Sequence, residues 1–171
     1  MLRRLVDGTA VELMMYNDVK NSLSIKSKLM SGELECAVLD KHLVVDVFQV
    51  MVAAQMAYQR YTTGKAACRT MHAEVLYSLS AMKSISNVFA TFGLDGNQRE
   101  LLIVVINPQK TNIEKIQSSI DGKEVSDIER SLRTGYDEAR IKEIYKISDT
   151  ELQVGSILDA ALSRMASKSF L

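Results

Sequence analysis

Leu101-Leu102-Ile103-Val104-Val105-Ile106 is a run of six consecutive aliphatic residues, and the prediction of the fold starts from it. The run is bounded by Glu100 on one side and by Asn107-Pro108 on the other. An uninterrupted aliphatic run of this length is typical of a strand that is covered on both faces. We therefore predict that residues 101–106 form the middle of a sheet.

Further strands are predicted on either side of this run. Residues 11–16 read as a short strand that ends at the turn residues Asn17-Asp18. The short apolar runs 37–39 and 43–45 are predicted as edge strands. In residues 73–79, the side chains of Ala, Val, Tyr and Leu alternate with Glu, Leu and Ser, which favours a strand, with a short helix as the alternative.

Helices are predicted in the remaining segments. Residues 23–30 place apolar side chains on one side of an amphipathic surface helix, which Gly32 ends. Residues 46–61 leave almost no polar face, so this helix belongs in the centre of the domain. Ser84 is predicted to cap a helix over residues 85–92, with Gly93 as its left-handed terminating residue.

The C-terminal part is predicted to be mainly helical. Ser126 with Glu129, and Ser148 with Glu151, have the spacing of capping boxes at helix starts. In the last helix, apolar residues recur at three- and four-residue steps from Val154 to Met165. This stripe, followed by Phe170-Leu171, is predicted to be core, a partner-binding surface, or both.

Length and composition indicate a single domain over residues 1–171. Hydrophobic residues make up 47% of the chain and charged residues 25%, as in an ordinary globular protein. We predict an α+β fold in which helices surround a small mixed β-sheet. The 21 basic and 21 acidic side chains cancel, which argues against a protein that holds nucleic acid by bulk charge alone.

The sequence indicates a protein of the cytoplasm and nucleus that does not enter a membrane. The longest apolar stretch, residues 43–57, contains Asp46, Gln49 and Gln55 and is shorter than the ~20 residues needed to span a bilayer. Cys36 and Cys68 are far apart and form no CxxC pair, so both are predicted to be reduced and buried.

No motif for catalysis, metal binding or cofactor binding is found in the sequence. It has neither a Walker loop nor a GxGxxG fingerprint, and neither histidine, His42 or His72, has ligands at metal-site spacing. We therefore predict no catalytic residue, no metal and no cofactor. The alternative is a cysteine-dependent enzyme, for which Cys68 beside Arg69 is the better nucleophile candidate.

One segment is poor in acidic residues. Between Asp46 and Asp95 the only acidic residue is Glu74, whereas four residues are basic: Arg60, Lys65, Arg69 and Lys83. If Lys65 and Arg69 share a face with Lys20, the three are predicted to contact RNA phosphates, with Tyr58 or Tyr61 available to stack on a base. The alternative is a solvated loop between two buried elements.

An ordered set of short motifs over nearly the whole chain resembles the PRPK-binding protein family, known as TPRKB in animals. The motifs in this sequence are Asp18-Val19-Lys20-Asn21, Met30-Ser31-Gly32, Asp46-Val47-Phe48-Gln49, Val52-Ala53-Ala54, Gly64-Lys65, Arg69-Thr70, Glu74, Leu79-Ser80, Phe92-Gly93, the run 101–106, Ile144-Tyr145-Lys146-Ile147-Ser148 and Gly155-Ser156-Ile157-Leu158-Asp159-Ala160. Two features depart from the family pattern: Val47 stands where proline is usual, and the segment before Val11 differs.

The resemblance implies a non-catalytic subunit of the EKC/KEOPS complex, which makes N6-threonylcarbamoyladenosine (t6A) in transfer RNAs that read ANN codons. Members bind a small atypical kinase, which contacts the threonylcarbamoyl transferase subunit, and they help to hold the transfer RNA, including its CCA end. On this basis we predict that Val75 and Leu76, or Leu158 and Leu162, bind the kinase. Lys20, Lys65 and Arg69 are predicted to bind tRNA; a free-standing RNA-binding protein is the alternative.

Overall fold

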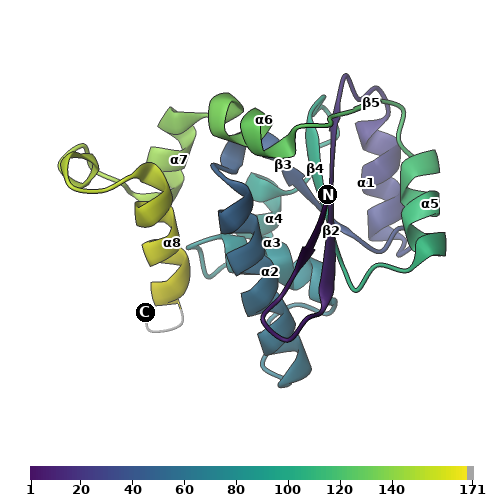
Figure 1. The fold of residues 1–171 in the computed structure, drawn as a ribbon, viewed down its shortest axis with the longest axis horizontal. Coiled ribbons are helices and arrows are strands. Elements are labelled where there is room, and N and C mark those ends of the chain that lie inside the picture. The colour runs from purple at the N-terminus through teal and green to yellow at the C-terminus, as the bar shows by residue number, and fades with distance from the viewer. Residues whose placement is uncertain (169–171) are drawn as a thin grey trace.

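The fold is a five-stranded antiparallel sheet with helices on both faces (Figure 1). The computed structural model describes residues 1–168, so Phe170 and Leu171 lie outside it. The strands are β1 (Leu2–Arg4), β2 (Ala10–Asn17), β3 (Ala37–Asp40), β4 (Leu101–Ile106) and β5 (Lys123–Glu124). Their order is β1-β2-β4-β3, with β5 beside β2. The predicted α+β class is confirmed; the sheet was predicted to be mixed, and all its described strand pairs are antiparallel.

The helices divide unequally between the two faces of the sheet. They are α1 (Ser22–Met30), α2 (Val47–Thr62), α3 (Met71–Leu79), α4 (Ile85–Phe92), α5 (Lys110–Ser118), α6 (Ile128–Gly135), α7 (Glu138–Tyr145) and α8 (Ile157–Ser167), with short 3-10 turns at Lys41–Leu43 and Glu151–Gln153. Figure 1 shows α1 and α5 on one side of the sheet and α2, α3 and α4 on the other. Helices α6, α7 and α8 extend this second layer.

Strand β4 is the centre of the sheet and is buried over its whole length, as predicted. Its side chains alternate between two hydrophobic clusters because successive residues of a strand point to opposite faces. Leu102, Val104 and Ile106 belong to the larger cluster, formed with α2 to α4 and α6 to α8. Leu101, Ile103 and Val105 belong to the smaller one, formed with α1 and α5.

Helix α2 lies centrally in the larger layer, where it was predicted, and packs on α3 and α8. Its N-cap is Asp46, whose carboxylate accepts a hydrogen bond from the Phe48 backbone N–H at 2.8 Å. Replacement of proline by Val47 therefore leaves the helix start intact, since Asp46 satisfies one of its free backbone donors.

Two strand predictions were wrong. Residues 73–79 belong to α3, which begins where the Thr70 hydroxyl accepts a hydrogen bond from the Ala73 N–H. Its buried residues Val75, Leu76 and Leu79 share one helical face, so the local alternation of polar and apolar residues was misleading. Residues 43–45 are buried but form the end of a 3-10 turn and an extended link to α2.

Several helix boundaries also differ from the predicted ones. Gly93 ends α4 with φ of −83°, and not in the left-handed region; a side chain there would meet the Phe89 carbonyl oxygen, 2.6 Å from the Cβ position. Helix α6 is capped by Asp127 instead of Ser126. Ser148 and Glu151 do bond to each other, but they open a 3-10 turn; the last α-helix starts later, at a capping box of Ser156 and Asp159.

Candidate protein and nucleic-acid interfaces

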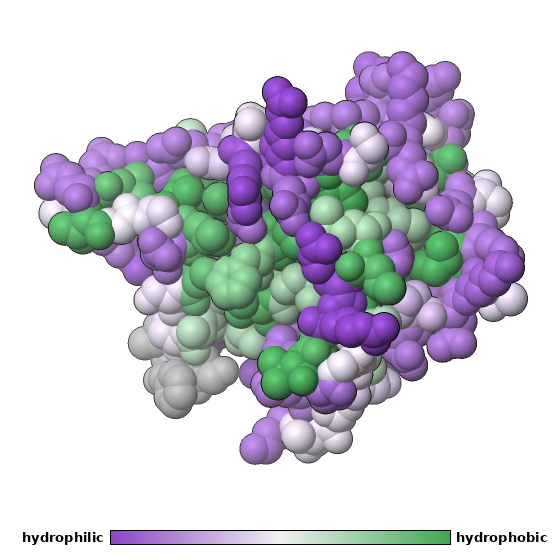
Figure 2. All heavy atoms as spheres, in the orientation of Figure 1, coloured by the Kyte–Doolittle hydropathy of each residue, from purple (hydrophilic) through white to green (hydrophobic). Residues whose placement is uncertain are grey.

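The exposed side of α2 forms the first candidate interface. We call the side chains of Val6, Phe48, Met51, Val52 and Met56 the α2 apolar face. Val6 and Phe48 are 91% and 57% exposed, and the five residues surround a shallow hollow of about 240 Å³ together with Arg4, Leu5 and Gln55. Figure 2 shows apolar surface over α2 and between α2 and α8. An exposed apolar surface of this kind marks a site of protein–protein contact.

Helix α8 borders this surface and carries two of the residues that were predicted to bind a kinase. Leu158 and Leu162 are half-buried and pack against the larger cluster from the outside. Helix α8 packs on α2 and α7, so it is a neighbour of the helix that carries most of the α2 apolar face (Figure 1). Val154 is not part of this stripe, since it precedes the helix and is exposed to solvent.

The other two residues predicted to bind a kinase are core residues. Val75 and Leu76 on α3 are buried, and both belong to the larger cluster. A partner could reach Val75 only if the fold opened. The reason is that α3 is a helix packed between α2, α4 and the sheet, whereas the sequence favoured a strand.

A groove of about 970 Å³ is the second candidate interface. It lies between α1 with the following loop on one side and α3 with α4 on the other, and we call it the α1–α4 groove. Its lining is mainly apolar and includes the exposed side chains of Met30, Tyr61 and Phe89. The side chains of Lys26, Glu35, His72 and Asp95 also line it. Its volume and its exposed aromatic side chains suit a ligand that can stack on an aromatic ring.

His72 is held in a fixed orientation on the groove wall. Its Nε2 accepts a hydrogen bond from the Ile106 backbone N–H at 3.1 Å, at the end of β4. Burial lowers the pKa of His72, and Glu35 opposes this only in part. The side chain is therefore neutral near pH 7 and ties α3 to the sheet, with Nε2 already occupied.

A basic loop joins α2 to α3 at one end of this groove. Lys65 and Arg69 are both exposed on it, between the groove residues Tyr61 and Thr70. Lys20 is exposed as well, but it precedes α1, and its backbone N–H donates a hydrogen bond to the carbonyl oxygen of Asp121, close to β5 and not to the basic loop. The structure thus brings two of the three predicted RNA-binding residues together and leaves the third apart.

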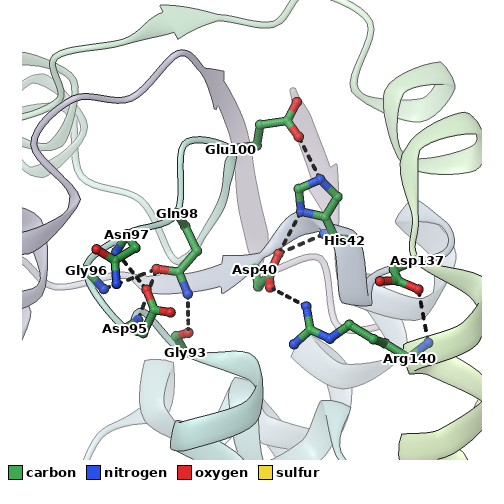
Figure 3. A network of polar contacts seen from close by, with 10 residues as sticks. All are labelled: Asp40, His42, Gly93, Asp95, Gly96, Asn97, Gln98, Glu100, Asp137 and Arg140. Atoms are coloured by element: carbon green, nitrogen blue, oxygen red, sulfur yellow. Dashed lines mark hydrogen bonds and ion pairs between the residues drawn. The ribbon is translucent and has the colours of Figure 1, made fainter.

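A network of charged residues connects the sheet edge to α7 (Figure 3). His42 lies between two carboxylates: its Nδ1 is 3.0 Å from Asp40 and its Nε2 is 2.7 Å from Glu100. Asp40 also meets Arg140 at 3.3 Å. Because both ring nitrogens are engaged, His42 lacks a free one to act as a general base. The sequence had not indicated this network, since Glu100 and Arg140 are far from His42 along the chain.

The two cysteines are poor nucleophiles. Cys36 is buried, as predicted, whereas the prediction was wrong for Cys68, which is only half-buried in the loop before α3. Burial raises the pKa of the Cys36 thiol to about 12, and partial burial together with the Glu74 carboxylate raises the pKa of Cys68 to about 11. Few thiolates are present at neutral pH under these conditions, and the thiolate is the reactive form. Residues 1–168 also contain no group of three or more His, Cys, Asp or Glu side chains arranged to hold a metal ion, and none of their helices has the length and hydropathy of a membrane span.

An exposed apolar helix face and a groove beside a basic loop define a protein that binds other macromolecules. Comparison with known proteins agrees with this class. Residues 16–169 match the family described as kinase binding protein CGI-121, and the chain belongs to this family. Among its relatives is a protein named EKC/KEOPS complex subunit TPRKB in Danio rerio, which is 34% identical over 160 residues, 92% of this chain and 90% of the relative.

Fungal relatives extend the similarity over the whole length. A protein named EKC/KEOPS complex subunit cgi121 in Schizosaccharomyces pombe is 26% identical over 171 residues, 96% of this chain and 98% of the relative. A protein of the same name in Aspergillus fumigatus is 28% identical over 153 residues, 85% of this chain and 81% of the relative. The resemblance predicted from short motifs is thereby confirmed at the level of the family.

Proposed function

We propose that this chain is a non-catalytic subunit of an EKC/KEOPS complex. In this role it binds the small atypical kinase subunit, contacts the threonylcarbamoyl transferase only through that kinase, and helps to hold tRNA for t6A modification of ANN-decoding tRNAs. It acts as one domain in the cytoplasm and nucleus, without a cofactor, a metal or a membrane. The names of its relatives and its membership of a kinase-binding family support this proposal.

The α2 apolar face is the observation that carries the kinase-binding part of the proposal. Together with Leu158 and Leu162 it offers aromatic, Met and branched aliphatic side chains on two neighbouring helices. Desolvated aromatic anchors dominate the energy of protein interfaces, and Phe48 is the most exposed aromatic residue within residues 1–168. We assign the kinase to this side of the molecule.

The α1–α4 groove and the basic loop support the tRNA-binding part. Single-stranded RNA is bound by cations that contact phosphates and by aromatic side chains that stack on bases. Lys65 and Arg69 supply the cations, and Tyr61 and Phe89 supply exposed rings in the adjoining groove. Lys20 would meet a different part of a tRNA, since it lies close to β5 and not to the basic loop.

The first test is a calorimetric titration of the purified chain into the kinase subunit of the same organism. Saturable binding at a one-to-one ratio is expected. A parallel titration with tRNA is expected to show weak binding, because the net charge is zero. Tight tRNA binding without any kinase binding would instead favour the free-standing RNA-binding protein, which the groove and the basic loop also suit. Turnover that depends on Cys68 would revive the cysteine-dependent enzyme.

A further inference from the structure

Glu74 fixes the backbone of the basic loop from inside the molecule. Its side chain is fully buried, and its Oε2 accepts hydrogen bonds from the N–H groups of Ala67 and Cys68 at 2.9 and 2.8 Å. Its Oε1 accepts a third bond from Arg60 Nε at 2.7 Å. Lys65 and Arg69 flank the two bonded amides, so the conformation of the basic loop depends on Glu74 and on its partner from α2.

Tyr77 connects this buried pair to the end of α8. The Arg60 guanidinium lies 5.6 Å from the centre of the Tyr77 ring, and Lys168 Nζ lies 3.2 Å from the same centre. Lys168 Nζ also donates a hydrogen bond to the Tyr77 carbonyl oxygen at 2.5 Å. A cation placed over an aromatic ring is attracted to it, and the attraction grows when the pair is removed from water.

Lys168, the residue that ends α8, is unusual because its side chain is buried. It is the C-cap residue of α8 and is only 8% exposed, although lysines are rarely buried. Burial and the nearby Arg60 lower its pKa to about 8, against the opposing effect of Glu74. Contacts with Tyr77 compensate for removing the ammonium group from water, and they anchor α8 to α3.

We infer that Lys168, Tyr77, Arg60 and Glu74 couple the kinase-binding side of the molecule to the basic loop, so that a kinase bound on α8 strengthens RNA binding at that loop. These four residues are called the α8–loop relay. The relay rests on the proposed function, because it needs a kinase at α8 and RNA at Lys65 and Arg69. A partner that holds α8 in its docked position keeps Lys168 on Tyr77. The like charge of Lys168 then favours the position of the Arg60 guanidinium on the Glu74 carboxylate, and Glu74 holds the loop in its binding conformation.

The relay acts in both directions, because coupling between two binding sites is reciprocal. A kinase that tightens RNA binding by a given factor must itself be bound more tightly, by the same factor, when RNA is present. Lys168, Tyr77, Arg60 and Glu74 are positioning residues in this scheme. None of them needs to touch either ligand.

The test measures this coupling factor with an RNA probe that is much shorter than a tRNA, so that direct contacts between RNA and kinase are minimised. A fluorescent single-stranded RNA hexanucleotide is titrated with the chain alone and with the chain saturated by its kinase, using anisotropy. The expected result for the unmodified chain is about a 5-fold tighter Kd in the presence of kinase, the low end of typical coupling. Lys168→Met keeps the apolar part of the side chain and removes its charge. This variant should still bind kinase alone and RNA alone, but kinase should no longer change its Kd for RNA.

A matched control is Lys115→Met, an exposed lysine on α5, which should keep the full factor. Amide hydrogen exchange supplies a second readout: kinase binding should increase the protection of Ala67 and Cys68 in the unmodified chain and not in Lys168→Met. If Lys168→Met does not fold, this protection in the unmodified chain decides the matter.

The outcomes separate the relay from the proposed function. The relay would be overturned if kinase did not change the RNA Kd of the unmodified chain, or if Lys168→Met kept the full change. In both cases the proposed binding of kinase and of RNA would remain. Failure of the unmodified chain to bind either ligand would overturn the proposed function itself.

Discussion

The α2 apolar face lies along the first part of α2, and the basic loop follows the last turn of the same helix. The first surface is apolar and the second is cationic. The first turns of α2 expose Phe48 and leave Met51 and Val52 half-buried beside it, and Arg4 is the charged residue that lines this hollow. The last turn exposes Tyr61 and leads into the basic loop. A neutral protein can therefore offer an apolar surface to a protein and a cationic rim to RNA without a net charge of either sign.

The buried region between these two surfaces differs from both of them. Between the two surfaces lie α3 and its charged cluster, where Glu74 is fully buried and pairs with Arg60. Buried charges are costly unless they are paired, and removing one partner is strongly destabilising. The Glu74–Arg60 pair thus supports the fold, and a substitution of either of these two residues should affect folding before it affects binding of either partner.

The largest effect is expected from Val75→Glu, which places a carboxylate in the larger cluster. Without a cation to pair with it, the change should cost more than about 4 kcal/mol, enough to unfold a domain of ordinary stability. Urea denaturation followed by circular dichroism measures it, with Val154→Glu as the matched control at an exposed position. A folded Val75→Glu variant that has lost only kinase binding would show that Val75 is an interface residue after all.

A smaller effect is expected for the alkylation rate of Cys68, which tests whether the basic loop only binds a ligand or carries a catalytic nucleophile. Alkylation of Cys68 in the native chain at pH 7.5 should be about 100-fold slower than that of a free cysteine, because a pKa near 11 leaves so little thiolate. Cys36 should react only after denaturation. The rates are followed by mass spectrometry with iodoacetamide, and rapid selective labelling of native Cys68 would contradict this account of the loop.

At the apolar side, Phe48→Asp should weaken kinase binding by about 30-fold, the loss of a typical interface anchor of 2 kcal/mol. An aspartate in the first turn of α2 suits the helix dipole, so the fold should be retained. Leu158→Glu, in the first turn of α8, should act in the same direction. Calorimetry with the kinase measures both, and unchanged affinity in both variants would move the interface away from α2 and α8.

At the basic rim, Lys65→Glu combined with Arg69→Glu should weaken RNA binding by about 10-fold and reduce the salt dependence, because fewer counterions are released. Kinase binding should not change, which is the reverse of the pattern for Phe48→Asp. Lys115→Glu on α5 serves as the control for net charge. Lys20→Glu tests whether a full tRNA reaches the region close to β5; an unchanged affinity there would remove Lys20 from the RNA path.

Patterns confined to one element were predictable from the sequence. The aliphatic run of β4, the apolar helix α2 and the amphipathic α1 all follow from side-chain periodicity, which is set by local geometry. Residues 73–79 were misread because a period of two and a helical face of Val75, Leu76 and Leu79 fit the same short stretch. Only contacts with α2 and α4 select the helix.

The candidate sites were less predictable than the fold. Lys65, Arg69, Leu158 and Leu162 were proposed as candidates from charge and periodicity within single segments. The α1–α4 groove was not, because its walls come from helices and loops that are distant in the chain. The Asp40–His42–Glu100 network and the α8–loop relay were missed for the same reason.

By itself the sequence determined the α+β class, the central strand, the family and the absence of recognisable catalytic motifs, since each of these depends on residue type and local order. Tertiary structure alone decided that Val75 is core while Phe48 is surface, that Lys20 stands apart from Lys65, and that Lys168 reaches Tyr77. The physical reason is that burial and pairing of charges depend on which distant elements pack together, and chain order does not encode those distances directly.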